Sequence, residues 1–412
     1  MKKIISIILA LVLMLALFSA CGKGETKAPS GTPSGSNGSA STPDESKGSE
    51  DEGSFSGTMK VGLLAPLTGS VAQYGVAVAN GVRLYTKEIN EKGGINGKKV
   101  ELVEYDEEGD AAKAVLGYNS LVDQGVVAIV GDVTTGPTVA VVSESQADRM
   151  PMITASATAL SVTYNEETGQ VYENMFRSCF IDPFQGEKMA SFAKEVLEAK
   201  TAAVLYNNGS DYSVGVAESF KAKANEIGLE IIADESYADG SIDFQGQLTN
   251  IAAKNPDVLF LPDYYEVIAL IAQQANSAGV TATMLGVDGW DTVLEAVTDP
   301  ALIEGAYYCS GYSTQDTREE VQTFLQAYKA EYGIEPNMFA AQGYDAAMIL
   351  FDAIAKADAD GKLDNETIIS YMKATDMNCV TGHVTFDEYN NPNKTAVIIN
   401  IASGEAKYWG NY

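Results

Sequence analysis

Short apolar segments alternate with helical patterns along most of the chain. Residues 59–67 form an apolar run that ends in the turn signal Thr68-Gly69-Ser70, and residues 76–91 then carry apolar side chains at helical spacing. The alternation continues to residue 154, and a second series of similar length covers residues 183–287. Strands that alternate with helices of about 10 to 15 residues predict parallel sheets with helices on both faces.

The two series define the expected elements. Strands are predicted over residues 59–67, 100–105, 126–130, 151–154, 202–206, 230–233, 258–261 and 283–287. Helices are predicted over residues 76–91, 111–123, 138–149, 183–199, 214–227, 244–254, 267–278, 318–332, 337–356 and 366–375. A hairpin is predicted near Asn390-Asn391-Pro392. The fold class is therefore α/β with two doubly wound parallel-sheet lobes, and the later helices complete these lobes because they are too few for a third.

The N-terminal segment differs from the rest of the chain. Lys2 and Lys3 precede an apolar run that ends at Phe18, and small residues then lead to Cys21. This layout is typical of a secretory signal peptide over residues 1–20, and the run is shorter than the roughly 20 residues of a spanning helix. A Cys after small residues resembles a bacterial lipoprotein signal, so Cys21 is predicted to carry lipid. The alternative is a secreted protein with an incidental Cys at the cleavage site.

Residues 21–57 have the composition of a linker. They are almost entirely Ser, Gly, Pro, Thr, Lys and acidic residues, with Phe55 as the one large apolar side chain. Such a segment buries too little surface to offset its conformational entropy, so we predict a disordered tether. With Gly/Ser character it would span about 30 to 35 Å on average.

Charge and cysteine content narrow the possible partners. The formal net charge of −29 over 412 residues argues against nucleic acid and anionic lipid, since both require clustered Lys and Arg. Contact with a membrane is therefore expected through the lipid anchor only. Beyond Cys21 the chain has Cys179, Cys309 and Cys379, too sparse a set for a disulfide framework, and buried free thiols are expected.

Motifs of catalysis are absent from the sequence. It contains neither a G-x-S-x-G elbow nor a phosphate loop that ends in Gly-Lys-Ser/Thr, and its only histidine is His383, which we expect on a strand surface. The acidic stretches 106–110 and 387–393 lack the spacing of a calcium-binding EF-hand. The sequence thus predicts no enzyme activity, no cofactor and no metal site.

Four predicted strand ends carry the candidate binding residues. Ligands of open α/β sheets bind beyond the carboxyl ends of the strands, where helix N-termini offer unpaired N–H groups. The loops at residues 131–138 and 154–158 suit a carboxylate through hydroxyl and N–H groups, and Asp288 in the loop at residues 285–290 suits an ammonium group. Residues 206–212 form the fourth loop.

Each candidate also has a structural alternative. Thr134, Thr135 and Thr158 would serve equally well as helix caps, and Asp288 as a turn residue. Aromatic residues near the loops would equally be ordinary packing residues; these are Tyr74, Tyr212, Tyr264 and Trp290. Pattern and composition leave these alternatives open.

Three stretches of sequence resemble a known family. Residues 67–75 read LTGSVAQYG, residues 89–97 read INEKGGING, and residues 104–106 read EYD. These are similar to the branched-chain amino-acid (Leu/Ile/Val) binding proteins of ABC transporters, which have the type I periplasmic-binding fold. The resemblance implies two lobes joined by a three-segment hinge. It assigns residues 58–180 and 312–386 to the N-terminal lobe, and residues 181–311 and 387–412 to the C-terminal lobe.

The resemblance also implies roles for individual residues. In that family the ligand carboxylate is held by a hydroxyl residue that matches Thr135, beside Thr134, and by a loop that matches Ser156, Ala157 and Thr158. The ammonium group meets an acidic residue that matches Asp288, a tyrosine that matches Tyr264 and the Ser156 carbonyl, while Tyr74 and Tyr212 line the cleft. The family often has Glu at the acidic position, and a cystine that some members carry near the first loops is absent here.

We therefore expect a monomeric solute-binding lipoprotein of an ABC importer on the extracytoplasmic face of the bacterial membrane. Its ligand would be a small amino acid, branched-chain or related, which it would deliver to the permease. The alternatives are a binding protein for an amide, urea or aromatic acid, and a ligand-sensing module.

Overall fold

The computed structural model describes residues 55–412. The predicted signal peptide, the predicted lipidation site Cys21 and all but the last three residues of the predicted tether lie outside the described residues. The first strand already begins at Gly57. Among the described helices, none combines the length and the apolar character needed to cross a bilayer.

The first sheet contains five parallel strands in the order β2-β1-β3-β4-β7. The last five residues of the interior strand β1 are buried, as expected for a strand covered on both faces. The strands are β1 (Gly57–Ala65), β2 (Lys98–Asp106), β3 (Ile129–Val130), β4 (Met152–Thr154) and β7 (Met175–Arg177). The connecting elements are α1 (Ala72–Glu91), α2 (Ala111–Asp123), α3 (Thr135–Ser145), the 3-10 helix η1 (Leu160–Val162) and the small hairpin β5 (Tyr164–Asn165) and β6 (Gln170–Val171).

The second sheet contains seven strands in the order β16-β15-β12-β11-β10-β8-β9. Five of them are parallel, and β15 and β16 add an antiparallel edge. The strands are β8 (Thr201–Asn207), β9 (Glu230–Tyr237), β10 (Val258–Phe260), β11 (Thr283–Gly286), β12 (Tyr307–Ser310), β15 (Val397–Ala402) and β16 (Glu405–Asn411). The helices are α4 (Asp182–Glu195), α5 (Asp211–Ile227), α6 (Gln245–Lys254), α7 (Tyr265–Ala278), η2 (Asp288–Trp290), α8 (Val293–Ala296) and η3 (Pro300–Ile303).

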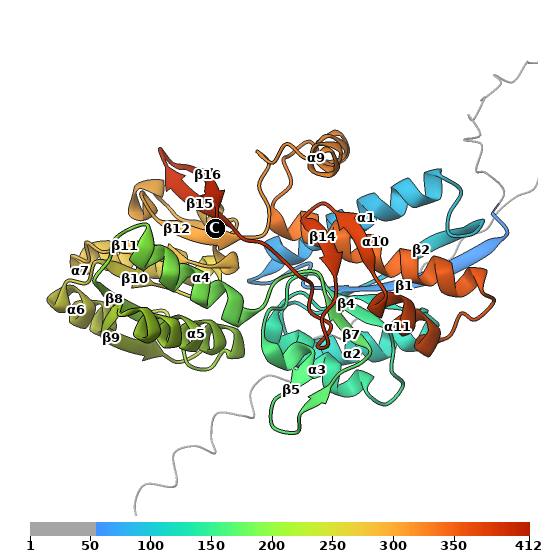
Figure 1. Cartoon of the computed structure of the whole chain (residues 1–412), viewed down its shortest axis with the longest axis horizontal. Helices are drawn as coiled ribbons and strands as arrows, with labels where there is room; N and C mark the ends of the chain where they lie inside the picture. The colour runs from blue at the N-terminus through green and yellow to red at the C-terminus, as the bar shows by residue number, and fades with distance from the viewer. Residues whose placement is uncertain (1–54) are drawn as a thin grey trace, which may run out of the picture. The chain divides into compact units, whose positions relative to one another are not determined.

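The segment between β12 and β15 returns to the first lobe. Helix α10 packs along α1 and against α11, and its burial reflects this central position. Figure 1 shows α10 and α11 beside the strands of the first sheet, while β15 and β16 lie with the second. The elements are α9 (Glu319–Tyr332), α10 (Met338–Ala359), α11 (Asn365–Lys373), β13 (Asp376–Cys379) and β14 (Gly382–Thr385).

The chain passes between the lobes three times. The connections are residues 178–181 between β7 and α4, residues 311–318 between β12 and α9, and residues 386–396 between β14 and β15. The α/β fold with two parallel-sheet lobes is confirmed. The predicted lobe boundaries fall within or next to these connections and stay a prediction.

Some predicted bounds differ from the structure. Helix α3 begins at Thr135, three residues earlier than predicted, because Pro137 fits within a first helical turn, and α1 begins at Ala72, four residues earlier. The chain reverses near Asn390 as predicted, with an antiparallel bridge between Phe386 and Pro392 and a hydrogen bond from the Asp387 N–H to the Asn391 carbonyl at 2.9 Å. The Asn390 side chain donates to the Met175 carbonyl at 3.0 Å. Two further hairpins, β13–β14 and β15–β16, were not predicted.

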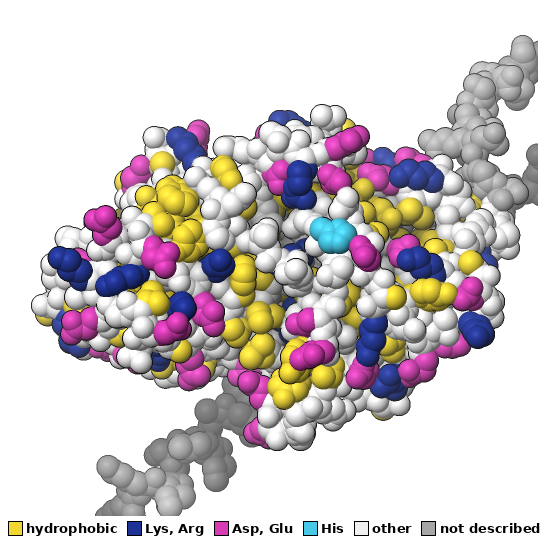
Figure 2. All heavy atoms as spheres, viewed as in Figure 1, with side chains coloured by type: hydrophobic (Ala, Val, Ile, Leu, Met, Phe, Trp, Pro, Cys, Tyr) yellow, Lys and Arg dark blue, Asp and Glu magenta, His cyan; other side chains and the backbone are white. Residues whose placement is uncertain are grey.

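The remaining landmarks agree with the sequence. Cys179, Cys309 and Cys379 are buried free thiols, as predicted. His383 is an exposed residue of strand β14 and lies 2.9 Å from the Asn378 side chain. Figure 2 shows His383 in cyan on a face where basic and acidic side chains are interspersed.

Candidate functional site

The predicted site residues follow the carboxyl ends of strands in both sheets. Thr135 follows β3 and Ser156 follows β4 in the first lobe. In the second lobe Tyr212 follows β8, Tyr264 follows β10 and Asp288 follows β11. This is the edge at which open α/β sheets bind ligands.

The loop after β3 directs a helix N-terminus into this region. Thr134 occupies the N-cap position of α3, but its side chain makes no capping hydrogen bond, and Thr135 is the first helical residue. The N–H groups of this first turn have no partner within the helix. The capping alternative therefore does not describe the Thr134 side chain, and both buried hydroxyl groups are available for other contacts.

The loop after β4 is held by side-chain to backbone hydrogen bonds. The Thr154 hydroxyl donates to the Asp132 carbonyl at 2.5 Å and accepts from the backbone N–H of Ala157 at 3.0 Å. The Ser156 hydroxyl donates to the Val133 carbonyl at 2.7 Å. These bonds tie the two loops together, and they occupy the Ala157 N–H that the resemblance would give to a carboxylate.

A buried arginine supports the same loop from behind. Arg177, the last residue of β7, is fully buried and donates to the carbonyls of Ala157 and Ala159, each at 2.9 Å. Burial lowers its pKa, although Cys179 and nearby acids oppose this shift. Arg177 was not among the predicted site residues, since a lone Arg in an apolar strand carries no signal about its partners.

Thr158 contacts an acidic residue that was not among the predicted site residues. The Thr158 carbonyl accepts from the backbone N–H of Asp182, the first residue of α4, at 3.0 Å. The Thr158 hydroxyl lies beside the Asp182 carboxyl group, which is almost completely buried. Asp182 precedes Pro183, and from sequence this pair predicts only the start of a helix.

Asp288 lies at the centre of the second-lobe residues. Its Oδ1 atom accepts from the Tyr212 hydroxyl at 2.6 Å and from the Gly289 N–H at 2.9 Å. Burial raises the pKa of Asp288 to about 6, and the hydrogen bonds from Tyr212, Gln185 and Gly289 oppose that shift. The carboxylate is therefore mostly ionised at neutral pH. The turn alternative holds in part, because Asp288 also opens the 3-10 helix η2.

Three tyrosines surround the carboxylate and join the lobes. Tyr212 and Tyr264 stack with ring centroids 4.9 Å apart, and Tyr74 meets Tyr264 edge-on at 5.7 Å. The Tyr74 hydroxyl, from the first lobe, donates to the Gly289 carbonyl at 2.5 Å in the second. A Cβ atom on Gly289 would lie 2.7 Å from the Tyr212 hydroxyl, so glycine permits this close approach.

Tyr264 brings the two lobes' binding groups together. Burial raises its pKa well above 10, and a hydrogen bond with the Thr135 backbone opposes that shift. Thr135 therefore lies next to the aromatic residues that surround Asp288. Trp290 does not join them: its indole N–H donates to the Leu261 carbonyl at 2.9 Å and its ring packs against Gly286 in the core of the second lobe.

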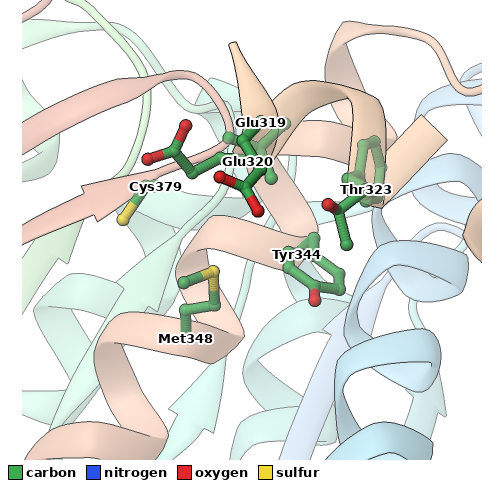
Figure 3. A pocket seen from close by; sticks show the side chains of 8 residues that line it. Glu319, Glu320, Thr323, Tyr344, Met348 and Cys379 are labelled. Carbon is green, nitrogen blue, oxygen red and sulfur yellow. The ribbon is translucent and has the colours of Figure 1, made fainter.

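A separate pocket lies in the first lobe, away from these residues. It has a volume of about 290 Å³, and Figure 3 shows it between the start of α9, helix α10 and the end of β13. Its lining residues are Glu319, Glu320, Thr323, Phe324, Tyr344, Met348, Cys379 and Val380. It includes none of the predicted site residues.

The site groups complement a zwitterion. The first lobe offers hydroxyl and N–H donors, and the second offers the Asp288 carboxylate among aromatic rings. Across residues 55–412, no group of three or more His, Cys, Asp and Glu side chains is arranged to hold a metal ion. The arrangement can bind a molecule that carries both a carboxylate and an ammonium group.

Comparison with known proteins shows the family of the chain. A family model described as periplasmic binding protein matches residues 58–406. The chain belongs to the periplasmic binding protein family. Within that family it is a type I member of the branched-chain amino-acid group. It is therefore a solute-binding protein that works outside the cytoplasm, and not an enzyme.

Individual relatives cover most of the chain. The Leu/Ile/Val-binding protein BraC3 of Rhizobium johnstonii is 31% identical over 331 residues, 80% of this chain and 87% of the relative. The leucine-, isoleucine-, valine-, threonine- and alanine-binding protein of Pseudomonas aeruginosa is 28% identical, over 80% of this chain and 86% of its own. The crystal structure of the substrate-binding protein LivJ of Streptococcus pneumoniae, in complex with isoleucine, has 33% identity and a TM-score of 0.79, and the match covers 86% of this chain and 99% of that one.

Proposed function

We propose that this periplasmic binding protein captures a small α-amino acid, branched-chain or related, between its lobes and delivers it to the permease of an ABC importer. The observation that carries the proposal is that the groups suited to the two charges of an amino acid lie on different lobes. Thr135 and Thr158 in the first lobe offer donors for a carboxylate, and the buried Asp288 in the second offers an anion for an ammonium group.

The ligand would stabilise the closed arrangement through contacts to both lobes. The carboxylate would meet the N-terminus of α3 and the Thr158 hydroxyl. The ammonium group would meet Asp288, Tyr264 and the Ser156 carbonyl, which accepts no hydrogen bond from any residue of the described part of the chain. Tyr74 and Tyr212 would cover the remaining sides. Relatives that are named for binding leucine, isoleucine and valine support an aliphatic side chain in the ligand.

The N-terminal features complete the proposal. A signal peptide over residues 1–20, lipid on Cys21 and a tether to residue 57 would hold the binding domain near its permease in the membrane. Replacing Cys21 by Ala should release the protein from the membrane fraction of its host cell into the soluble exported fraction. Unchanged membrane association would contradict the lipid anchor and leave the binding role intact.

The binding role is tested on residues 52–412, which form a unit with its own core. The protein is unfolded and refolded to remove carried-over ligand, and thermal unfolding is measured against amino acids, amides, urea and aromatic acids. We expect stabilisation by aliphatic α-amino acids, and its loss when the carboxylate or the ammonium group of the ligand is blocked. A response to amides, urea or aromatic acids alone would contradict the amino-acid site.

A further inference from the structure

Arg177 is a buried cation that no acidic side chain contacts. The other three of the four arginines in the chain are partly exposed and form ion pairs; these pairs are Arg83 with Glu104, Arg149 with Glu366 and Arg318 with Asp316. Within residues 55–412, Arg177 donates only to neutral groups, which are the Ala157 and Ala159 carbonyls and, at 3.0 Å, the Thr163 hydroxyl. A guanidinium keeps its charge in proteins, so the fold buries a positive charge beside neutral acceptors alone.

The acids in the neighbourhood of Arg177 are engaged elsewhere. One oxygen of Asp387 accepts from two backbone N–H groups of its own turn, at 2.8 and 2.9 Å. Asp182 accepts from the Gln185 side-chain amide at 3.4 Å. The Nε–H group of Arg177 has no partner in the described part of the chain. The guanidinium therefore acts most directly on the two carbonyls to which it is bonded.

One of these carbonyls shares its peptide unit with a free donor. The Ala157 carbonyl accepts from Arg177 at 2.9 Å, and the N–H of the same peptide is that of Thr158. The peptide is trans, so this N–H points away from the carbonyl oxygen and hence away from the guanidinium. Thr158 is almost completely buried, and its N–H has no acceptor among residues 55–412. Buried N–H groups nearly always have a partner, so we expect the acceptor to come from the ligand.

We propose that Arg177 is a positioning residue that orients and polarises the Ala157–Thr158 peptide, so that the Thr158 N–H binds the ligand carboxylate. This inference rests on the proposed amino-acid function and deepens it, because it restricts the ligand to molecules with an anionic group at this position. A cation bonded to a carbonyl strengthens the N–H of the same peptide as a donor. The ligand carboxylate in turn supplies the negative charge that the buried guanidinium lacks.

Nuclear magnetic resonance on the wild-type protein tests the peptide directly. Labelling of Ala carbonyls with 13C and of Thr amides with 15N selects Ala-Thr pairs, and the sequence has only three, at residues 157–158, 282–283 and 374–375. Saturating leucine should move the Thr158 proton signal downfield. The signals of Thr283 and Thr375 are internal controls, because their N–H groups already donate to carbonyls at 3.1 Å. The Thr158 signal is identified by its absence in Thr158→Ser.

Two variants separate the charge of Arg177 from its hydrogen bonds. Arg177→Gln keeps a donor without the charge, and calorimetry on refolded residues 52–412 should show leucine binding about 30-fold weaker, the scale of one charge acting at an effective dielectric constant of about 20. Arg177→Lys keeps the charge and should lose only about threefold. The downfield shift of Thr158 in the leucine-bound protein should shrink in Arg177→Gln and persist in Arg177→Lys. The control Thr163→Val removes a different acceptor of the guanidinium and should leave leucine affinity unchanged.

A test without a variant covers the case in which neither replacement folds. With 15N-labelled arginine, the Nε–H signal of Arg177 should move when leucine binds, and the signals of the three partly exposed arginines should not. The proposal is overturned if bound leucine leaves the Thr158 or the Arg177 signal in place. It is also overturned if Arg177→Gln and Arg177→Lys lose affinity equally with the Thr158 shift intact, since Arg177 would then support only the shape of the loop.

Failure of the proposed function gives a different result. Leucine is replaced as the probe by the most strongly stabilising amino acid of the panel if leucine itself does not bind. If no amino acid binds the wild-type protein, the proposed function fails. Binding with an unmoved Thr158 signal removes only the role of Arg177.

Discussion

The two lobes present different chemistry to the space between them. In the first lobe the binding loops are held by hydroxyl to backbone bonds, such as Thr154 to the Asp132 carbonyl and Ser156 to the Val133 carbonyl. In the second lobe the binding groups are large side chains, with Asp288 bonded to Tyr212 and Tyr264 stacked on the Tyr212 ring. The first lobe presents hydroxyl and N–H dipoles, and the second presents the Asp288 carboxylate beside aromatic rings.

This difference follows from the two charges that the lobes are proposed to bind. An anion is well held by several N–H and hydroxyl dipoles at a helix N-terminus. The backbone offers an ammonium group only single carbonyl oxygens. A buried carboxylate with aromatic neighbours binds an ammonium group more strongly than such a carbonyl does. The first lobe should therefore tolerate loss of one donor better than the second tolerates loss of its charge.

The largest effect is expected from removing the Asp288 carboxylate, because the difference between the lobes depends on its charge. Asp288→Ala should weaken amino-acid binding about 100-fold or more, since truncating one partner of a buried charged pair costs about 2 to 5 kcal/mol. Wild-type affinity should also fall as pH drops through about 6, because protonation of Asp288 removes the charge. Calorimetry measures both effects. The control is Asp234→Asn, an exposed residue of the same lobe that pairs with Lys221, and it should bind normally.

Affinity that survives in Asp288→Ala would contradict the ammonium role. It would also remove the asymmetry between the lobes, because the second lobe would then contribute only aromatic surface.

The next prediction concerns the hydroxyl group of Thr135 in the first lobe. Thr135→Val keeps the shape of the side chain and removes one hydroxyl donor to the proposed carboxylate, so affinity should fall about 30-fold, or about 2 kcal/mol. Thr134→Val, one residue earlier at the N-cap of α3, should cost less than Thr135→Val because we assign the direct contact to Thr135. Calorimetry with the free amino acid measures both losses. Equal affinities of Thr135→Val and the wild type would place the hydroxyl away from the carboxylate.

The proposed site of the second lobe leaves a clearer trace in the sequence than that of the first. Asp288 and Tyr212 are proposed to bind through their own side chains, and their loops were identified from polar and aromatic residues at strand ends. In the first lobe the decisive features are backbone groups: which N–H is free depends on Thr154, and the loop shape depends on Arg177. Neither partner can be deduced from spacing, because both bonds form only after the strands pair.

The strands of the fold also differ in how far they could be predicted from the sequence. The alternation of apolar strands and helices predicts β1 to β4 of the first sheet and β8 to β11 of the second, because burial on two faces leaves a direct trace in the sequence. It did not predict the short parallel strands β7 and β12. The hairpins β13–β14 and β15–β16 were missed; β13, β14 and β16 are only partly buried and mix polar with apolar residues, whereas β15 is mostly apolar. Asp182 was missed because a buried acid has the same sequence signature as an exposed helix-starting acid.

Two buried acids behind the first-lobe loops allow a test of stability. Glu107 and Asp132 are fully buried side by side; burial raises the pKa of Glu107 to about 7 and that of Asp132 well above its usual range. A carboxyl with a raised pKa in the folded state contributes stability at low pH that is lost as pH rises from about 4.5 through about 7. Glu107→Gln should therefore raise the free energy of unfolding by about 2 kcal/mol at pH 8 and leave it unchanged at pH 4.5.

Thermal or urea unfolding at the two pH values measures this difference. The control is Glu108→Gln, whose carboxylate is exposed and pairs with Lys113, and it should show no such pH dependence. If Glu107→Gln is destabilising at pH 8, the pair does not share a proton in the folded protein, and the first-lobe loops owe their shape to the hydroxyl network alone.

The smallest effect concerns the bond that joins the two lobes. In Tyr74→Phe the hydroxyl that donates to the Gly289 carbonyl and accepts from the Tyr265 N–H is lost, while the ring still stacks on Phe339 at 4.2 Å. Both bonds join the first lobe to the second and should be lost when the lobes separate, so affinity should fall about fivefold, or about 1 kcal/mol, through faster ligand release. Stopped-flow measurement separates the two rates. Tyr118→Phe removes a hydroxyl bonded to Asp148 within the first lobe and should leave release unchanged, whereas equal release rates for Tyr74→Phe and wild type would show that closure depends on the ligand and not on this tyrosine.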